Sequence, residues 1–306
     1  AELGANVTIT DKKTKEQLYR SIDRLKHLPI TFHIGSHDIK DFLDADVIFK
    51  GPSVPWTLEG IVEAEKKRIP IEMELSFFAK HSPAKIIGIT GTRGKSTTTQ
   101  LIFNLLKLSG FSVYLGGGMP GISTISYLKT LGKNDWVVME ISSWALSGFH
   151  RKKVSPHIAV FTNIYPDHLN YYKSMDDYLY DKKAIFMYQK KDDYLIVNRA
   201  LNKPLLHYIN IMKSNVIFFT GYDFPYRLNY LKGEHNLENA VAAFKVAKIL
   251  KMNQNKTVKI ISDFKGLSFR QEVVGKKYNV MFINDTTSTT PVATIKAIDS
   301  FSDRKI

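Results

Sequence analysis

Residues 85–97, KIIGITGTRGKST, have the pattern of a strand, a glycine-rich turn and the start of a helix. Residues 85–90 are rich in isoleucine, as in a buried central strand, and Gly91 and Gly94 allow the backbone to turn tightly. Such a turn points its backbone N–H groups inward, and the helix that follows aims the positive end of its dipole at the same point. The stretch therefore predicts a phosphate-binding loop.

The residues that follow Gly94 supply the chemistry of a nucleoside triphosphate site. Lys95 would reach the outer phosphates, and the Ser96 hydroxyl would bind a magnesium ion. The strict pattern G-x-x-x-x-G-K-[ST] is not met, because Ile89 stands where its first glycine belongs. The shorter core GTRGKST carries the prediction, and the alternative is a surface turn that contains Gly-Lys-Ser by chance.

Length and composition describe a globular chain. Its 306 residues are 44% hydrophobic and 24% charged, which fits about two domains with ample core. There is no uncharged apolar run of about 18 residues and no signal peptide pattern at the start, so we expect a cytoplasmic protein that does not enter a membrane. The absence of cysteine excludes disulfides, thiolate metal sites and cysteine nucleophiles. Catalytic groups must therefore be oxygen or nitrogen.

The chain is basic, with 43 lysine and arginine residues against 29 aspartate and glutamate residues and a net charge of +14. The lysines are scattered, and no basic stripe alternates with aromatic residues. This favours a lysine-rich surface and an anionic small-molecule substrate over a nucleic-acid partner.

Before residue 83 the chain alternates strand and helix patterns. Residues 4–10 and 46–50 have the composition of strands, and residues 14–28 have helical spacing. Asp11 follows the first of these strands, where dinucleotide-binding folds place a ribose contact, although a structural cap is an equal alternative.

Polar residues follow two later strand patterns. Glu140 lies within WVVMEISSWAL, which we expect to be a strand, with the loop two strands away. Its carboxylate is a candidate magnesium or water ligand near the γ-phosphate. Asn163, Asp167 and His168 follow the apolar run HIAVF, and an imidazole beside a carboxylate can serve a metal or a phosphate oxygen. An ordinary strand-end glutamate and a structural histidine are the alternatives.

The predicted fold class is α/β. A truncated Rossmann-like domain is expected at 1–82 with its first strand missing, followed by a P-loop ATPase domain with a mostly parallel sheet at 83–285. Residues 286–306 would begin a third domain.

The motifs of the chain occur in the order and spacing of the Mur ligases, and the resemblance covers nearly the whole sequence. They are GITGTRGKSTTT (88–99), EISSWAL (140–146), NIYPDHLNYY (163–172), YLYDKKAIF (178–186), GEHNLENAVAAF (233–244), GLSFRQE (266–272) and NDTTSTTPVATIKAI (284–298). Within the family the chain looks most like the member that adds D-glutamate to UDP-N-acetylmuramoyl-L-alanine. The lysine or diaminopimelate adder and folylpolyglutamate synthetase resemble it less.

The resemblance implies an ATP- and Mg²⁺-dependent amide ligase of peptidoglycan synthesis, a cytoplasmic monomer that works through an acyl phosphate. The catalytic residues that it implies are Lys95, Glu140, His168 and Lys182, with Lys182 carbamylated. Metal ligands would be Ser96, Glu140, His168 and Lys182. ATP contacts would fall on Gly91, Thr92, Arg93, Gly94, Lys95, Ser96, Thr97, Asn236, Asn239, Arg270 and Asp285. The UDP-substrate would contact Asp11, Lys12, the turn at 50–55, Gly118 and Ser142.

Three positions depart from the family pattern. Gly118 in GGGMPG replaces an asparagine, Phe269 in GLSFRQE replaces a histidine, and the uridine turn has the sequence GPSVP.

Two other function classes compete with the ligase. A P-loop kinase or NTPase would turn over ATP with one substrate or with water, and a nucleotide-binding module would bind ATP without turnover. By charge pattern alone Lys182 would lie on a solvated helix face. The resemblance instead assigns it to the site, and Lys183, about 100° further around the helix, is expected to face elsewhere and to tolerate alanine.

Overall fold

The computed structural model describes residues 1–119, 121–288 and 291–301. Pro120 of the GGGMPG turn, Thr289 and Thr290 of the NDTTSTTP motif and residues 302–306 lie outside the described residues. The chain divides into two compact units, Ala1–Glu74 and Leu75–Ile306. Within the described part, no helix is both long and apolar enough to span a bilayer.

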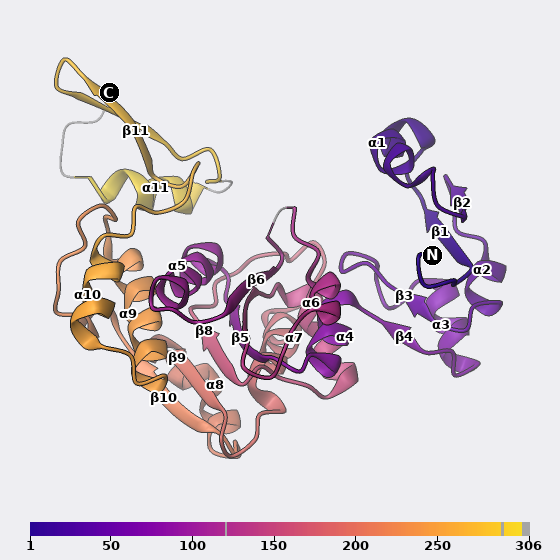
Figure 1. Cartoon of the computed structure of the whole chain (residues 1–306), viewed down its shortest axis with the longest axis horizontal. Coiled ribbons are helices and arrows are strands. Elements are labelled where there is room, and N and C mark those ends of the chain that lie inside the picture. The colour runs from indigo at the N-terminus through magenta and orange to yellow at the C-terminus, as the bar shows by residue number, and fades with distance from the viewer. Residues whose placement is uncertain (120, 289–290, 302–306) are drawn as a thin grey trace. The chain divides into compact units, whose positions relative to one another are not determined.

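The first unit contains two small parallel sheets (Figure 1). Its elements are β1 (Val7–Asp11), α1 (Lys15–Leu25), β2 (Ile30–Ile34), α2 (Ile39–Leu43), β3 (Ile48–Phe49), α3 (Glu59–Lys66) and β4 (Ile71–Glu72). β1 pairs with β2, and β3 pairs with β4. The small core of this unit joins Phe42, Ile61, Ala64 and Ile71. The strand predicted at 46–50 is present but is only two residues long, and β2 was not predicted.

The second unit is built on a six-stranded parallel sheet, which confirms the predicted α/β class. The strand order is β10-β9-β8-β5-β7-β6. The strands are β5 (Lys85–Thr90), β6 (Val113–Gly117), β7 (Trp136–Glu140), β8 (Ile158–Phe161), β9 (Tyr194–Asn198) and β10 (Asn215–Phe219). The chain adds β6 and β7 on one side of β5 and β8 to β10 on the other, so the strand order reverses around β5. Ligands of open α/β sheets bind where the order reverses, at the carboxyl ends of the strands.

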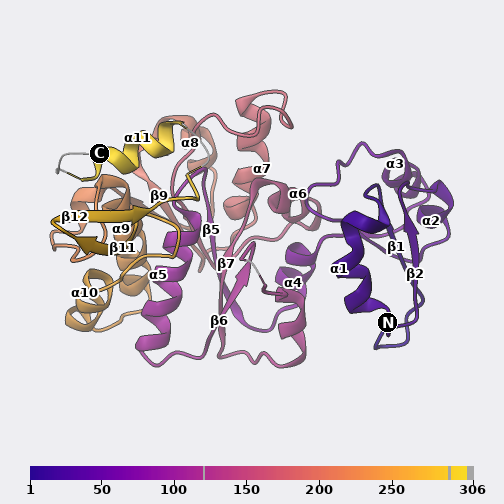
Figure 2. The same cartoon turned by 90° about the horizontal axis from the view of Figure 1, so that it is seen from above.

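Helices cover both faces of this sheet (Figures 1 and 2). One face carries α5 (Lys95–Leu108), α9 (Glu234–Ile249) and α10 (Gln254–Ser262), and the other carries α4 (Glu74–His81), α6 (Ser143–Lys152), α7 (Met175–Met187) and α8 (Asn202–Ile209). Because side chains alternate along a strand, Ile87 and Ile89 enter the first core while Ile86 enters the second. A strand buried on both faces explains the near-continuous apolar run of β5.

Short elements complete the second unit. They are the 3₁₀ helices η1 (Thr124–Lys129), η2 (Arg199–Leu201) and η3 (Gly221–Asp223), the antiparallel hairpin of β11 (Glu272–Lys277) and β12 (Val280–Asn284), and α11 (Pro291–Asp299). The hairpin begins at Glu272, the last residue of the GLSFRQE motif, so it positions the end of that motif.

Candidate functional site

The loop between β5 and α5 is closed by two glycines for which no other residue fits. Gly91 and Gly94 have φ angles of 150° and 80°. A Cβ at Gly91 would lie 2.0 Å from Thr162 Oγ1, and a Cβ at Gly94 would lie 2.4 Å from Asn239 Oδ1. The loop is therefore packed directly against the end of β8 on one side and against α9 on the other.

Lys95 is the first residue of α5, and its ammonium folds back over the loop. Its Nζ donates to the carbonyls of Gly91 at 3.1 Å and Thr92 at 3.0 Å. Burial lowers the pKa of Lys95, and the nearby Glu140 carboxylate opposes that shift. The side chain is half-buried. The ammonium therefore lies over the loop that is predicted to bind phosphate, within the electrostatic influence of Glu140.

Glu140 ends β7, and this strand is a direct neighbour of β5. Ile89 pairs with Glu140 in the parallel register. Glu140 was expected two strands away from the loop, and this is wrong because β7 pairs directly with β5. The strand was also expected to continue through SSWAL, but it ends at Glu140 and α6 begins at Ser143. Ser142 caps that helix by accepting from Ala145 N at 3.2 Å. The acid thus lies at the carboxyl edge of the sheet, beside the phosphate loop.

The turn after β6 approaches Glu140 through its main chain. Gly118 N donates to Glu140 O at 2.9 Å, and a Cβ at Gly117 would lie 2.0 Å from the same oxygen. Gly117 has φ 85°, which also favours glycine. This contact holds the predicted substrate turn beside the predicted metal ligand.

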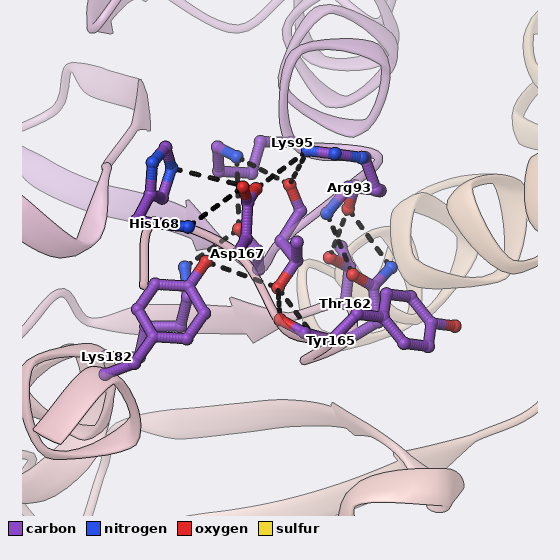
Figure 3. Close-up of polar contacts among 11 residues, drawn as sticks. Arg93, Lys95, Thr162, Tyr165, Asp167, His168 and Lys182 are labelled. Atoms are coloured by element: carbon purple, nitrogen blue, oxygen red, sulfur yellow. Dashed lines mark hydrogen bonds and ion pairs between the residues drawn. The ribbon is translucent and has the colours of Figure 1, made fainter. Parts of the chain in front are cut away.

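His168 belongs to the loop after β8 and has φ 56°, an uncommon backbone conformation for a histidine. The backbone N–H of His168 donates to Asp167 Oδ1 at 3.0 Å, and the ring Nε2 lies 3.7 Å from Asp167 Oδ2 (Figure 3). Burial lowers the pKa of the imidazole, and Asp167 opposes that shift. The ring centroid lies 4.8 Å from that of Trp144. Burial therefore favours the neutral ring.

Lys182 lies on α7 and is 1% exposed. The alternative drawn from the charge pattern, that Lys182 lies on a solvated helix face, is therefore wrong. Its Nζ donates to Gly91 O at 2.9 Å and lies 4.6 Å from the centre of the Tyr178 ring. Burial, followed by the charge of Lys95, places the pKa of Lys182 well below its ordinary value. A buried amine with a depressed pKa is populated in its neutral, nucleophilic form at lower pH than an exposed lysine.

Asn236 and Asn239 on α9 are both buried and form a hydrogen-bonded row that reaches the phosphate loop. Thr98 Oγ1 donates to Asn239 Oδ1 at 3.0 Å, and Asn239 Nδ2 donates to Asn236 Oδ1 at 3.2 Å. Asn236 Nδ2 in turn donates to Lys232 O at 2.7 Å. These amides tie α9 to the first turn of α5, which contains Ser96 and the buried Thr97.

Arg270 and Asp285 come from the segments that flank the hairpin. Arg270 Nη2 donates to Ser96 Oγ at 3.2 Å, so the guanidinium reaches the phosphate loop. Asp285 accepts from Gln271 N at 3.1 Å and from the hydroxyl of Ser288, and thereby holds the loop that carries Arg270. Phe269, in the place of the family histidine, is 55% exposed.

The remaining predicted substrate residues lie in the first unit. Asp11 ends β1 and accepts from Lys13 N at 2.8 Å, which is a local turn contact of the capping kind. Lys12 is exposed. In the 50–55 turn Lys50 is 5% exposed, and its Nζ donates to Gly51 O at 3.1 Å. The turn is therefore organised around a buried ammonium.

Sequence reasoning named Asn163 as a ligand candidate but missed that it clamps the phosphate loop, and it gave Trp144 no role. Both amide atoms of Asn163 bond to the backbone of Arg93, at 2.8 and 3.1 Å. Trp144 packs on His168, and its indole nitrogen is buried without a hydrogen-bond partner in the described part of the chain. The available signal for Asn163 was its position just after a predicted strand, whereas Trp144 lay inside the strand expected through SSWAL and gave no signal.

The donor set partly fits a magnesium ion. The hydroxyl of Ser96 and the carboxylate of Glu140 are oxygen ligands of the kind that Mg²⁺ takes together with phosphates and water. Within residues 1–119, 121–288 and 291–301, no group of three or more histidine, aspartate or glutamate side chains could hold a metal by itself. A second ion would need a further oxygen ligand, which the predicted carbamate on Lys182 would supply.

The burial of Lys183 predicts that its substitution lowers the stability of the fold. Lys183 does face away from the loop, but it is only 9% exposed, and its Nζ lies 4.5 Å from the ring centre of Tyr180 and 4.3 Å from that of Tyr208. Lys183→Ala should therefore lower the free energy of unfolding by about 1–3 kcal/mol through lost packing and cation–π contacts. Urea denaturation measures this loss. Lys183→Met, which keeps the stem, should lose less, and an alanine variant as stable as wild type would contradict the expectation.

Comparison with known proteins identifies the family that the chain resembles. Residues 89–224 match the Mur ligase middle domain. A UDP-N-acetylmuramoylalanine--D-glutamate ligase of Clostridium acetobutylicum is 32% identical over 323 residues, which cover 98% of this chain and 69% of that protein. The ligase of the same name from Borreliella burgdorferi strain ZS7 is 33% identical over 325 residues, covering 98% and 70% of the two chains.

Solved structures share the fold. MurF from Acinetobacter baumannii superposes with a TM-score of 0.61 at 16% identity and covers 85% of this chain and 68% of that one. MurF ligase from Thermotoga maritima, solved in complex with ADP, gives a TM-score of 0.58 at 19% identity, covering 83% and 70%. These structures support the fold assignment, and the relatives in sequence confirm the resemblance drawn from the motifs.

Proposed function

The chain belongs to the Mur ligases, ATP-dependent ligases of peptidoglycan synthesis, and we propose that it joins D-glutamate to UDP-N-acetylmuramoyl-L-alanine in the cytoplasm. The observation that carries the proposal is the convergence of Lys95 and Lys182 on the carbonyl of Gly91, with Glu140 on the strand beside it. The proposal includes the earlier expectations of a monomer that binds no nucleic acid.

The chemistry requires activation of a carboxylate, which is a poor acyl donor. ATP phosphorylates the carboxylate of the nucleotide-sugar substrate, and the amine of D-glutamate then attacks the acyl phosphate to give an amide, ADP and phosphate. The bond between the γ-phosphorus and the bridging oxygen breaks as a carboxylate oxygen bonds to phosphorus. Phosphate leaves in the second step with the oxygen that it took from the carboxylate.

Each group of the site has a proposed part in this reaction. Lys95 and the N–H groups of the first turn of α5 bind the β- and γ-phosphates, and the Asn236–Asn239 row, Arg270 and Asp285 line the nucleotide side. Ser96, Glu140, His168 and a carbamate on Lys182 would hold magnesium, which neutralises charge on the phosphoryl group when bound. Asp11, Lys12, Gly118 and Ser142 are proposed contacts of the nucleotide-sugar.

ADP release by the full protein tests the proposal. With ATP, Mg²⁺ and UDP-N-acetylmuramoyl-L-alanine present, release should require D-glutamate, and L-lysine, diaminopimelate and L-alanine should not replace it. Release with the first substrate or water alone would assign the chain to the kinase or NTPase class. Binding of ATP without release under any of these conditions would assign it to the nucleotide-binding modules.

Glu140→Gln should separate metal binding from nucleotide binding. The change removes a negative oxygen ligand while it keeps the shape of the side chain, so the Mg²⁺ concentration for half-maximal activity should rise on the order of tenfold. The affinity for ATP measured without metal should change little. Asp192→Asn, at an exposed position before β9, is the matched control. An unchanged magnesium titration would show that Glu140 is only structural.

A further inference from the structure

Both backbone polar groups of Arg93, in the loop between β5 and α5, are held by the segment that follows β8. Its N–H donates to Asn163 Oδ1 at 2.8 Å, and its carbonyl accepts from Thr162 Oγ1 at 2.8 Å and from Asn163 Nδ2 at 3.1 Å. Thr162 and Asn163 directly follow β8, so the sheet itself fixes this point of the loop. The backbone of Arg93 is therefore anchored to the segment that follows β8.

The side chain of Arg93 crosses the loop toward the residues of the site (Figure 3). Nη1 lies 2.9 Å from Asp167 Oδ2 and 3.5 Å from Thr92 O. The side chains of Arg93 and Asp167 are 43% and 20% exposed. An ion pair exposed to this degree stabilises little, because water solvates both partners. The guanidinium can therefore exchange its partner at small cost.

The charges near the loop leave an excess of cations. Glu140 and Asp167 act on Lys95 as carboxylates, while Arg93 and Arg270 act on it as cations. With Lys95 itself, three cationic side chains stand against two carboxylates. Arg93 and Lys95 also both donate to the neutral carbonyl of Thr92, which is a weaker acceptor than a phosphate oxygen.

We propose that the guanidinium of Arg93 binds the terminal phosphate of ATP, leaves Asp167 to do so, and stays on the phosphoryl group during its transfer. This inference rests on the proposed function for the reaction, although nucleotide binding alone can test it. A planar guanidinium offers two parallel N–H donors to two phosphate oxygens, which a lysine cannot do. The arginine takes up and gives up no proton. It stabilises charge on the equatorial oxygens, as an arginine supplied in cis does in other phosphoryl transfers.

Asp167 serves in this scheme as the resting partner of Arg93. Oδ1 of Asp167 accepts a hydrogen bond from the backbone N–H of His168 at 3.0 Å, so the carboxylate stays in place when the guanidinium leaves. After release it remains 3.7 Å from Nε2 of His168. The exchange thus removes a cation from Asp167 without opening the loop that carries His168.

The affinities for ADP and for a non-hydrolysable ATP analogue, measured on the full chain, test the inference. Arg93→Ala should lower the affinity for the analogue on the order of tenfold or more and leave the affinity for ADP within about twofold of wild type, since ADP lacks the terminal phosphate. The affinity of Arg93→Lys for the analogue should lie between those of wild type and Arg93→Ala. Arg227→Ala, a change at an exposed arginine, is the matched control, and thermal unfolding of each variant shows whether it is folded.

The competing role of Arg93 is to brace Asp167, and Asp167→Asn distinguishes the two. Removing the competing carboxylate should leave binding of the ATP analogue at least as tight as in wild type. The inference would be overturned if Arg93→Ala lost affinity for both nucleotides equally or for neither. It would also be overturned if Arg93→Ala and Asp167→Asn lowered the affinity for the analogue equally. A wild-type chain that binds both nucleotides but releases no ADP would contradict the proposed function and not this inference.

Discussion

Lys95→Ala is expected to lower the rate of ATP-dependent ligation on the order of a thousandfold, the upper range for loss of one electrostatic contact to a transition state. Lys95 begins α5, and its Nζ lies within 3.1 Å of two loop carbonyls, which places a positive charge at the phosphate cradle. Steady-state ADP release with saturating substrates measures the effect. The fold should persist, because the described partners of the ammonium are main-chain carbonyls at the edge of the sheet.

Lys107→Ala provides the matched control for Lys95→Ala. Lys107 is exposed in the last turn of the same helix, where its ammonium lies 5.6 Å from the ring centre of Phe103. This variant should keep the wild-type rate. A folded Lys95→Ala enzyme that ligates at the wild-type rate would contradict the assignment of the loop as a phosphate cradle.

Lys182→Ala should lower the rate on the order of a hundredfold or more, the range for removal of one stabilising group. The lysine is almost fully buried against Gly91 O, and its depressed pKa favours the neutral amine. A neutral amine can take up carbon dioxide and release a proton to become a carbamate, so an anionic oxygen ligand would lie beside His168 where a protonated lysine would place a cation. Activity should then depend on bicarbonate, and acetate should partly restore the alanine variant.

The pH dependence follows from the same shift. Because the pKa of Lys182 is lowered in the folded protein, the amine is neutral above that pKa and is protonated below it. The carbamate, and with it the activity, should be lost as the pH falls through the folded pKa. Lys183→Met is the matched control and should keep its activity. Full activity of Lys182→Ala, or a loss that no small carboxylate relieves, would contradict the carbamate.

The central strand and its loop could be predicted because local pattern decides them. The isoleucines of β5 are buried on both faces of the sheet, and Gly91 and Gly94 occupy positions that a Cβ cannot. The first unit was harder to predict. β3 and β4 are two residues long and exist only as partners of each other, so the sequence pattern could not define their ends. β2 alternates at Ile30, Phe32 and Ile34 but was not singled out.

Contacts between distant segments could not be predicted from the sequence. Strand order is one example, since nothing local to Glu140 shows that β7 lies directly beside β5. The burial of Lys183 is another, because it depends on Tyr208 from a different helix. Motif spacing predicted that Lys95 and Lys182 belong to one site, and the structure places the ammonium groups of both on Gly91 O. It could not show that Asp167 is the partner of Arg93.

Transfer of oxygen-18 from the carboxylate of UDP-N-acetylmuramoyl-L-alanine tests the central claim most directly. An acyl phosphate leaves one carboxylate oxygen on the phosphate when the amine of D-glutamate displaces it. If the substrate carboxylate is labelled and the full protein is supplied with ATP, Mg²⁺ and D-glutamate, mass spectrometry of the released phosphate should find the label. Phosphate without label, released together with ADP, would contradict an acyl-phosphate ligase and would mean that water attacks ATP directly.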